Sequence, residues 1–290
     1  MTVTIDSSFV NQYSGNIHLL LEQRTSKTRG IFREEEKRGE KHFFDRLGKF
    51  TASKITSRLE PTILQDASHS RRMCTVDTYQ SSTSLDSVDK LKLLIDPSSE
   101  YSQEVAASLA RVFDDVVIDA LIGTASTGKD GSGTQALPSG QKIAHGSAGL
   151  TAAKIDSALE LLQAAEVDLD MTQVFMLLPP SAMTDLIQDS GSKLTSFDFQ
   201  GDKFFLKDGK GLAYRGVKFI VSNMIPAITA GSVYRAILFT DKAVKIAIGR
   251  QLDVKAAERP DLNFALQISS YMAVGAVRME DEQVVEIAFQ

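Results

Sequence analysis

Residues 96–123 read DPSSEYSQEVAASLARVFDDVVIDALIG, and this stretch decides the fold class. Asp96-Pro97 is a helix start signal, because proline fits well at the first helical position. Apolar side chains then recur at three- and four-residue steps and form one stripe, made of Val105, Leu109, Val112, Phe113, Val116, Val117, Ala120 and Leu121. The pattern predicts a long amphipathic helix over residues 97–123, ended by Gly123.

The segment before this helix has few apolar residues from which to build a core. In residues 1–45, Ile17, Leu20 and Leu21 hint at a helical stripe, but the rest is polar and charged. We expect this segment to be an arm that needs a partner surface. Residues 46–96 are rich in Thr and Ser, and Phe50–Ser57 and Met73–Gln80 are the predicted strands of a long polar hairpin. Such a hairpin is marginal in isolation.

The charge of the chain is distributed unevenly. Between Gln23 and Arg58 there are eleven basic and five acidic residues, so this window carries +6 and the remainder −11, which together give the net charge of −5. A basic arm on an acidic body suits an arm that lies on a neighbouring subunit. A solvated helix of mixed charge explains the same window equally well, since acids and bases alternate between Arg33 and Lys41.

The region after the long helix predicts a mixed domain. A loop rich in Gly and Ser runs to Gly149, and a second helix follows with Thr151 as its N-cap. Val174–Leu178 is entirely apolar, which is typical of a strand buried on both faces. Pro179-Pro180 ends that strand, and Ser181 is expected to cap a short helix.

The last part of the chain is nearly all predicted strand, separated by turn signals. The expected strands are Val217–Ser222, Val233–Phe239, Val244–Gly249, Leu262–Ser269, Tyr271–Met279 and Val284–Phe289. With the helices before them, they predict an α+β fold.

The sequence offers few groups for catalysis or metal binding. Cys74 is the only cysteine, so an internal disulfide and a cysteine-based zinc site are excluded, and we interpret it as a structural thiol. No two of the four histidines lie three or four residues apart, and each is expected at the surface: His18, His42, His69 and His145. We therefore predict no catalytic, cofactor-binding or metal-ligating residue, no cofactor, and a protein that is not an enzyme.

The stretch from Gly123 to Lys129 resembles a phosphate-binding loop, Gly-x₄-Gly-Lys-[Ser/Thr], but falls one residue short of it. Asp130 stands where the motif needs a hydroxyl, and its carboxylate repels phosphate. The motif also needs a strand before the loop and a helix after it, whereas here the predicted helix comes first. We therefore expect a flexible loop.

Two groups of basic residues are candidates for contact with nucleic acid. Arg24, Lys27 and Arg29, or Arg71 and Arg72, are candidates for touching phosphates. Without aromatic interleaving or a known binding module, such contact is expected to be weak and independent of sequence. The apolar runs are too short to span a bilayer, and the start of the chain lacks a secretory signal, so no membrane partner is expected.

The order of these elements resembles the major capsid proteins of tailed phages, which share the Hong Kong 97-type fold. The resemblance covers essentially the whole chain. Its carriers are Phe9-x-x-Gln12-Tyr13, His69-x-Arg71-Arg72, Leu85-Asp86-x-x-Asp89, Asp96-Pro97 with Tyr101, Ile122-Gly123, Gln141-x-Ile143-Ala144 and Gly149-Leu150-Thr151.

The resemblance implies a division of the chain into five segments. Residues 1–45 are expected to be the N-terminal arm, and residues 46–96 the extended loop (E-loop) with its return. Residues 97–144 correspond to the spine helix and loop of the peripheral domain, 145–240 to the axial domain, and 241–290 to the closing strands of the peripheral domain. Some relatives cross-link a hairpin lysine to a neighbouring asparagine. Lys54 lies in that region, but no motif identifies it and we predict no cross-link.

The function implied is that of a structural protein which self-assembles into hexamers and pentamers of an icosahedral head enclosing double-stranded DNA. The expected partners are other copies of the chain, non-specifically contacted DNA, and separate scaffolding, portal and decoration proteins. The expected location is the virion, after assembly in the host cytoplasm. Three alternatives stay open: an encapsulin-like nanocompartment shell, a nucleotide-binding enzyme that uses the Gly123–Lys129 loop, and another virion component such as a tail protein.

Overall fold

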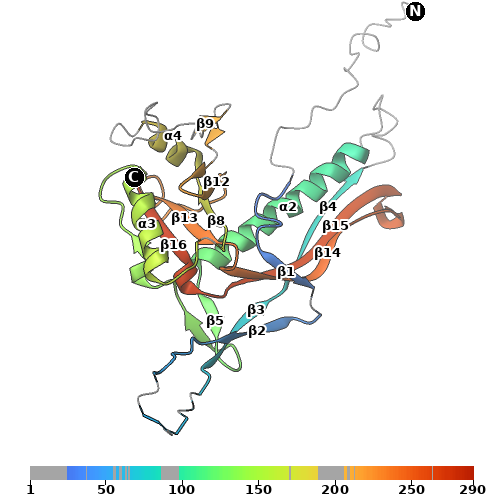
Figure 1. Cartoon of the computed structure of the whole chain (residues 1–290). Helices are drawn as coiled ribbons and strands as arrows, with labels where there is room; N and C mark the ends of the chain where they lie inside the picture. Colours follow the sequence, from blue (N-terminus) through green and yellow to red (C-terminus); the bar gives the residue numbers. More distant parts are fainter. Residues whose placement is uncertain are drawn as a thin grey trace, which may run out of the picture. The chain divides into compact units, whose positions relative to one another are not determined.

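The computed structural model describes residues 25–36, 38–54, 57–58, 61–62, 64, 66–85, 98–169, 171–188, 206–207, 210–211, 213–262 and 264–290. The chain divides into two compact units. Figure 1 labels their helices and strands. The smaller unit holds the described residues of Asp77–Phe113 and Gly249–Val274. The larger unit holds those of Lys27–Val76, Asp114–Ile248 and Gly275–Gln290. Three long elements contribute residues to both units, namely helix α2 (Ser98–Ile122) and strands β14 (Val244–Arg259) and β15 (Ala265–Arg278).

The long helix predicted from residues 96–123 is confirmed as α2, Ser98–Ile122. The start signal Asp96-Pro97 lies outside the described residues. Gly123 ends the helix, and its N–H donates to the Asp119 carbonyl at 2.7 Å. A Cβ at position 123 would lie 2.5 Å from that oxygen, so glycine is required there. The predicted apolar stripe is buried at Val105, Leu109, Phe113, Val117 and Leu121.

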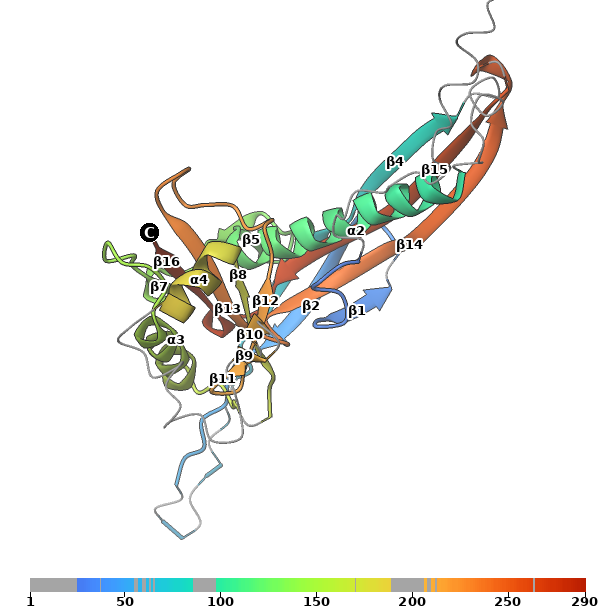
Figure 2. The same cartoon turned by 90° about the horizontal axis from the view of Figure 1, so that it is seen from above.

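In the smaller unit, α2 lies along a ribbon of long strands (Figure 2). Strand β4, Asp77–Leu85, pairs antiparallel with β15, Ala265–Arg278, in a register that runs from Asp77↔Val274 to Leu85↔Leu266. The Ser270 hydroxyl of β15 donates to the Val105 carbonyl of α2 at 3.3 Å and ties helix to strand. Strand β14, Val244–Arg259, lies on the other side of β15.

The expectation of two strands at Leu262–Ser269 and Tyr271–Met279 is wrong, because β15 runs through both without a break. Ser269-Ser270 interrupts the apolar pattern without being a turn, since both residues are buried and the Ser270 hydroxyl has its acceptor on α2. Leu262 belongs to the short helix η3, Pro260–Leu262, that precedes the strand.

The larger unit is built on a mixed six-stranded sheet in the order β11-β12-β8-β13-β16-β7. Its strands are β11 Ala213–Tyr214, β12 Val217–Val221, β8 Val174–Leu178, β13 Tyr234–Thr240, β16 Val284–Phe289 and β7 Lys142–Ile143. Strand β8 pairs parallel with β12 and antiparallel with β13. Its predicted burial is confirmed for Val174, Met176, Leu177 and Leu178. A separate pair is formed by β9, Leu206–Lys207, and β10, Lys210–Gly211.

Two helices of the larger unit pack against one cluster of apolar side chains from this sheet. They are α3, Ala152–Ala164, and α4, Pro180–Gln188. Thr151 holds the predicted N-cap position with extended backbone, but its side chain makes no capping hydrogen bond. The prediction that Ser181 caps α4 is wrong, because Pro180 itself takes the first helical position, where its missing N–H costs nothing.

A second sheet of the larger unit has the order β2-β3-β5-β6. It contains a hairpin, but the paired strands lie at other residues than those predicted. Its strands are β2 Lys41–Leu47, β3 His69–Thr75, β5 Ala125–Thr127 and β6 Gly133–Gln135. No strand forms at 50–54 or 57, the described residues of the predicted strand Phe50–Ser57. The predicted strand Met73–Gln80 is divided between β3 and β4, and Val76 between them donates its N–H to Glu40.

Gly275 of β15 packs directly against the end of β3, and its substitution tests how closely the two strands approach. A Cβ there would lie 2.1 Å from the Thr75 carbonyl oxygen and 2.8 Å from Cys74 Sγ. We predict that Gly275→Ala lowers the free energy of unfolding by about 1–3 kcal/mol, because backbone has to shift. Equilibrium urea unfolding of the unassembled chain measures it.

Gly140→Ala is the matched control, since its added methyl group meets nothing within 4 Å. Equal stability of the two variants would contradict the close approach at Gly275.

Candidate functional site

The base of the β2–β3 hairpin is where segments distant in sequence meet. The hairpin register runs from Lys41↔Thr75 to Leu47↔His69. At its base, Phe44 and Cys74 enter a buried apolar cluster that also contains Ala125, Ala247, Val277 and Met279. Beyond the base, the described residues between 48 and 68 are exposed, except for Gly48 and Ala67, which are partly buried. The body therefore holds the base of the hairpin and leaves the tip uncovered.

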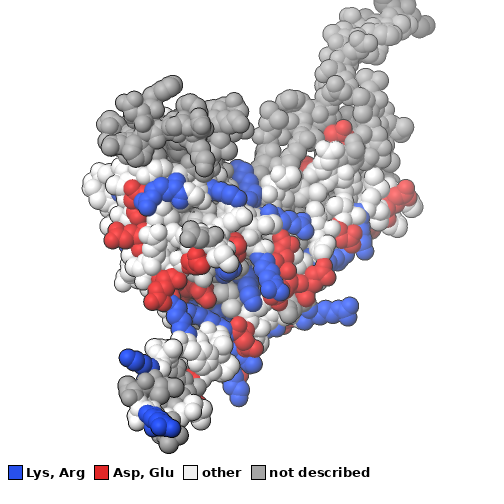
Figure 3. All heavy atoms as spheres, viewed as in Figure 1, with Lys and Arg blue, Asp and Glu red and all other residues white. Residues whose placement is uncertain are grey.

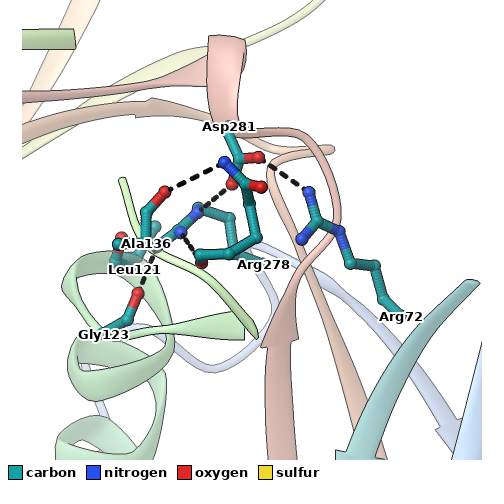
Figure 4. A network of polar contacts seen from close by, with 7 residues as sticks. Arg72, Leu121, Gly123, Ala136, Arg278 and Asp281 are labelled. Carbon is teal, nitrogen blue, oxygen red and sulfur yellow. Dashed lines mark hydrogen bonds and ion pairs between the residues drawn. The ribbon is translucent and has the colours of Figure 1, made fainter. Parts of the chain in front are cut away.

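The side chain of Arg278 is the centre of a buried polar network beside this base (Figure 4). Its guanidinium is fully buried. Nε donates to Asp281 Oδ1 at 2.6 Å. Nη1 donates to the carbonyl oxygens of Leu121 and Gly123 at 3.0 and 2.6 Å, and Nη2 donates to that of Gln135 at 3.0 Å. Four of the five N–H groups of an arginine are thus satisfied.

Asp281 carries the network into the hairpin. Its second oxygen, Oδ2, accepts from Nη2 of Arg72 on β3 at 2.7 Å, so one carboxylate bridges two guanidinium groups (Figure 4). Arg72 and Asp281 are both buried. The Nη1 atom of Arg72 is buried too and has no hydrogen-bond partner among the residues described. Because Leu121 lies in the last turn of α2, the network links the end of that helix to the hairpin.

A second anchor holds the described part of the N-terminal segment. The buried carboxylate of Asp114, on α2, accepts hydrogen bonds from the backbone N–H groups of Lys27 and Thr28 at 2.9 and 3.1 Å. It also accepts one from the Thr28 hydroxyl at 2.6 Å. Lys27 Nζ donates to the Val221 carbonyl at 2.7 Å. Residues 27–28 are therefore clamped to the larger unit.

The following residues pack on the same unit. Phe32 is buried and stacks on Phe239, with ring centroids 5.2 Å apart. Strand β1, Arg33–Glu36, then pairs parallel with β14 from Lys245 to Ile248. The expectation that the whole of 1–45 depends on a partner surface is therefore wrong for residues 27–36, because buried groups of the same chain hold them. Ile17, Leu20 and Leu21 lie outside the described residues.

The expectation of a flexible loop at Gly123–Lys129 is also wrong. Strand β5 pairs with β3 through Arg72↔Thr127 and Met73↔Ser126, and with β6 on its other side. The Gly128 N–H donates to the Arg71 carbonyl at 3.3 Å. These amides bond within the chain, and α2 precedes the segment, so it lacks the strand–loop–helix geometry of a phosphate-binding loop.

The remaining candidate residues are spread over the larger unit. His42 Nε2 lies 3.0 Å from the Gly39 carbonyl oxygen, and His145 Nδ1 accepts the Ser147 N–H at 3.0 Å. His69 lies at the end of the hairpin base, His18 lies outside the described residues, and Cys74 is buried. In the described part of the chain, no three His, Cys, Asp or Glu residues gather as a metal site. No helix there is both long and apolar enough to cross a membrane.

The phosphate-contact candidates differ in their accessibility. Arg72 is excluded, because it is buried and bonded to Asp281. Arg71 pairs with Asp45 at 2.6 Å, and Arg29 lies 3.9 Å from Glu34. Lys27 is committed to the clamp, and Arg24 lies outside the described residues.

Sequence reasoning missed Arg278, Asp281 and Asp114. The signal for Arg278 was present, since it is the one charged residue in the predicted apolar strand Tyr271–Met279. A lone charge in such a run must find partners inside the fold. Its acceptors at Leu121, Gly123 and Gln135 are backbone atoms, which no residue pattern reveals.

The fold matches those of phage capsid proteins. It is similar to the capsid structure of cyanophage P-SCSP1u, with a TM-score of 0.74, 17% identity, and coverage of 97% of this chain and 93% of that chain. The capsid of Ralstonia phage GP4 matches with a TM-score of 0.72 at 12% identity, over 100% of this chain and 97% of that one. A structure from Mycobacterium phage Che8 matches with a TM-score of 0.71 at 18% identity, over 96% of this chain and 96% of that one.

These likenesses define the class: the chain has the α+β, Hong Kong 97-type fold of a phage capsid subunit, as predicted. No curated protein sequence is significantly similar to it. The model of the phage capsid protein family matches residues 5–290, and the chain belongs to this family. It is a structural capsid protein.

The bridging carboxylate gives a test of the network. We predict that Asp281→Asn lowers the free energy of unfolding by about 3–5 kcal/mol, because two buried guanidinium groups lose their counter-charge. Urea unfolding of the unassembled chain measures the effect.

Asp45→Asn is the control, since the Asp45–Arg71 pair is equally short but exposed. Its loss is expected to cost less than about 1 kcal/mol. An Asp281→Asn variant as stable as this control would show that the network contributes little.

Proposed function

We propose that the chain is the major capsid protein of a tailed phage and self-assembles into the hexamers and pentamers of an icosahedral head around double-stranded DNA. It acts in this proposal without catalysis or cofactors. The family match and the fold support the capsid role, and the uncovered hairpin tip supports assembly through extended contacts between copies.

The observation that carries the proposal is the exposure of apolar side chains on the hairpin. Phe50 is 58% exposed, Leu64 is 89% exposed, and Leu47 at the end of β2 is 56% exposed. Burying a Phe or Leu side chain contributes about 1.5–3 kcal/mol, and a single chain forgoes that contribution here. A neighbouring subunit that covers the tip recovers it.

The segments take the following roles in this proposal. Residues 1–45 are the N-terminal arm, with its root fixed by the Asp114 clamp, and residues 46–96 are the E-loop with its return. Residues 97–144 form the spine helix and loop, 145–240 the axial domain around the capsomer centre, and 241–290 the closing strands of the peripheral domain.

The tip carries charge as well as apolar groups. Lys54 and Arg58 are exposed, and Figure 3 shows basic side chains at the tip and nearer the body. Contact with packaged DNA is non-specific in this proposal, and scaffolding, portal and decoration functions belong to separate proteins. Assembly takes place in the host cytoplasm and places the chain in the virion.

The direct test is to express the chain alone and examine it by negative-stain electron microscopy and size-exclusion chromatography. We expect closed shells or rings of five and six subunits. A chain that remains monomeric at all concentrations and binds ATP in a manner lost in Lys129→Ala would contradict the proposal and favour a nucleotide-binding enzyme.

The hairpin tip gives a sharper prediction. In the double variant Phe50→Asp/Leu64→Asp, shells and rings are expected to disappear, because charged groups replace the apolar groups that a neighbour covers. The free energy of unfolding of the single chain is expected to change by less than about 0.5 kcal/mol, since both positions are exposed. Sedimentation velocity and urea unfolding measure the two effects.

The matched control is Ser53→Asp/Thr62→Asp, which adds the same charge to the tip and keeps both apolar side chains. It is expected to retain assembly. Normal assembly of the Phe50→Asp/Leu64→Asp variant would show that the tip is not part of the interface.

A further inference from the structure

A basic hollow of about 720 Å³ lies beside the hairpin base in the larger unit. Arg46 of β2, Arg71 and Arg72 of β3, and Lys129 after β5 contribute four cations to its lining, and Asp45 contributes one anion. Arg72 is buried and balanced by Asp281, so the accessible lining carries two more positive than negative side chains, with Arg46, Arg71 and Lys129 against Asp45.

The two acids that contact arginines of the lining are already committed. Asp45 pairs with Arg71 at 2.6 Å, and Asp281 divides its two oxygens between Arg72 and Arg278. Arg46 and Lys129 form no ion pair with any described residue. Like charges held together in a hollow raise its local potential, and an incoming anion lowers it. In the single chain, the positive charges of the hollow therefore lack a balancing anion.

We infer that the hollow receives a carboxylate side chain from a second copy of the chain. The inference rests on the proposed function, because it names the partner of the same hairpin region. A second copy of the chain can provide such a carboxylate, because outside Gln23–Arg58 the acidic residues exceed the basic ones by eleven. The hollow also adjoins the hairpin, whose tip is the proposed interface, so a neighbour that covers the tip passes close to it.

The dimensions of the hollow favour a side chain over DNA. A volume of about 720 Å³ admits one or two side chains. A DNA duplex, whose major groove alone is about 12 Å wide, is too broad to enter a recess of that volume, so only phosphates at its outer edge would meet the rim. Charged pairs of this kind fix register and partner choice in interfaces.

A charge series at Lys129 tests the inference, because this lysine is exposed in the turn between β5 and β6 and its replacement leaves the fold intact. Lys129→Glu is expected to raise the subunit concentration needed for shells or rings by about tenfold or more, as expected when like charges meet at an interface. Lys129→Gln is expected to lie between Lys129→Glu and the unchanged chain. The matched control Lys129→Arg keeps the charge and is expected to assemble within about twofold of it.

Zero-length cross-linking identifies the partner group. Shells or rings of the unchanged chain, built from equal amounts of isotopically light and heavy subunits, are treated with a carbodiimide, which joins an amine to a carboxylate in contact with it. Mass spectrometry is expected to find Lys129 joined to an Asp or Glu of the other isotopic form.

Four results would overturn the inference. In the first, Lys129→Glu assembles like the unchanged chain, and in the second, Lys129 cross-links only within its own chain. In the third, Lys129→Glu shells form normally and lose only DNA or ATP binding, which makes phosphate the occupant. In the fourth, the unchanged chain stays monomeric at all concentrations and binds ATP in a manner lost in Lys129→Ala, so the proposed function fails and the inference falls with it. In the first three results the proposed function stands.

Discussion

A single fully buried guanidinium, that of Arg278, joins the parts of the larger unit that come from distant places in the sequence. Its hydrogen bonds reach the end of α2, the loop after it, the strand β6 and, through Asp281, the hairpin strand β3. A charge without water needs all of these acceptors, and their positions are therefore fixed relative to one another. The packing of Gly275 against Thr75, without a Cβ between them, is possible only when the hairpin base lies in this place.

The fixed base and the uncovered tip of the hairpin have separate physical roles. The base is held by groups that are satisfied within one chain, whereas the tip holds apolar side chains that one chain does not cover. In the proposed assembly, the stability of the subunit and its affinity for neighbours therefore depend on different residues. Exposed apolar groups on an extended hairpin also invite unspecific association, and the charged residues Lys54 and Arg58 limit it.

Sequence periodicity predicted the elements whose pattern reflects burial alone. The helix α2 and the strand β8 follow from regular apolar spacing, and their boundaries agree with the prediction within one residue. The prediction failed where a polar group has a distant partner. Ser270 looked like a break in β15 because its acceptor, the Val105 carbonyl, lies far away in the sequence.

The hairpin register and the buried network show the same limit. The strands β2 and β3 are charged and only partly buried, so their alternation does not distinguish them from the polar segments beside them. The Arg278 network uses backbone carbonyl oxygens, and the Asp114 clamp uses backbone N–H groups, which every residue type carries. Only the three-dimensional fold shows which backbone carbonyl oxygens and N–H groups lie opposite a charge.

The place of β16 in its sheet has a consequence for the timing of biosynthesis. This strand is made after all the others of the sheet, yet it lies between β13 and β7, and Arg278 and Asp281 come only shortly before it. Chains fold from the N-terminus as they leave the ribosome. The hairpin and α2 therefore emerge well before the strand that completes the body. A nascent chain that has not yet reached Val284 therefore lacks the strand that lies between β13 and β7, and its larger sheet is unfinished.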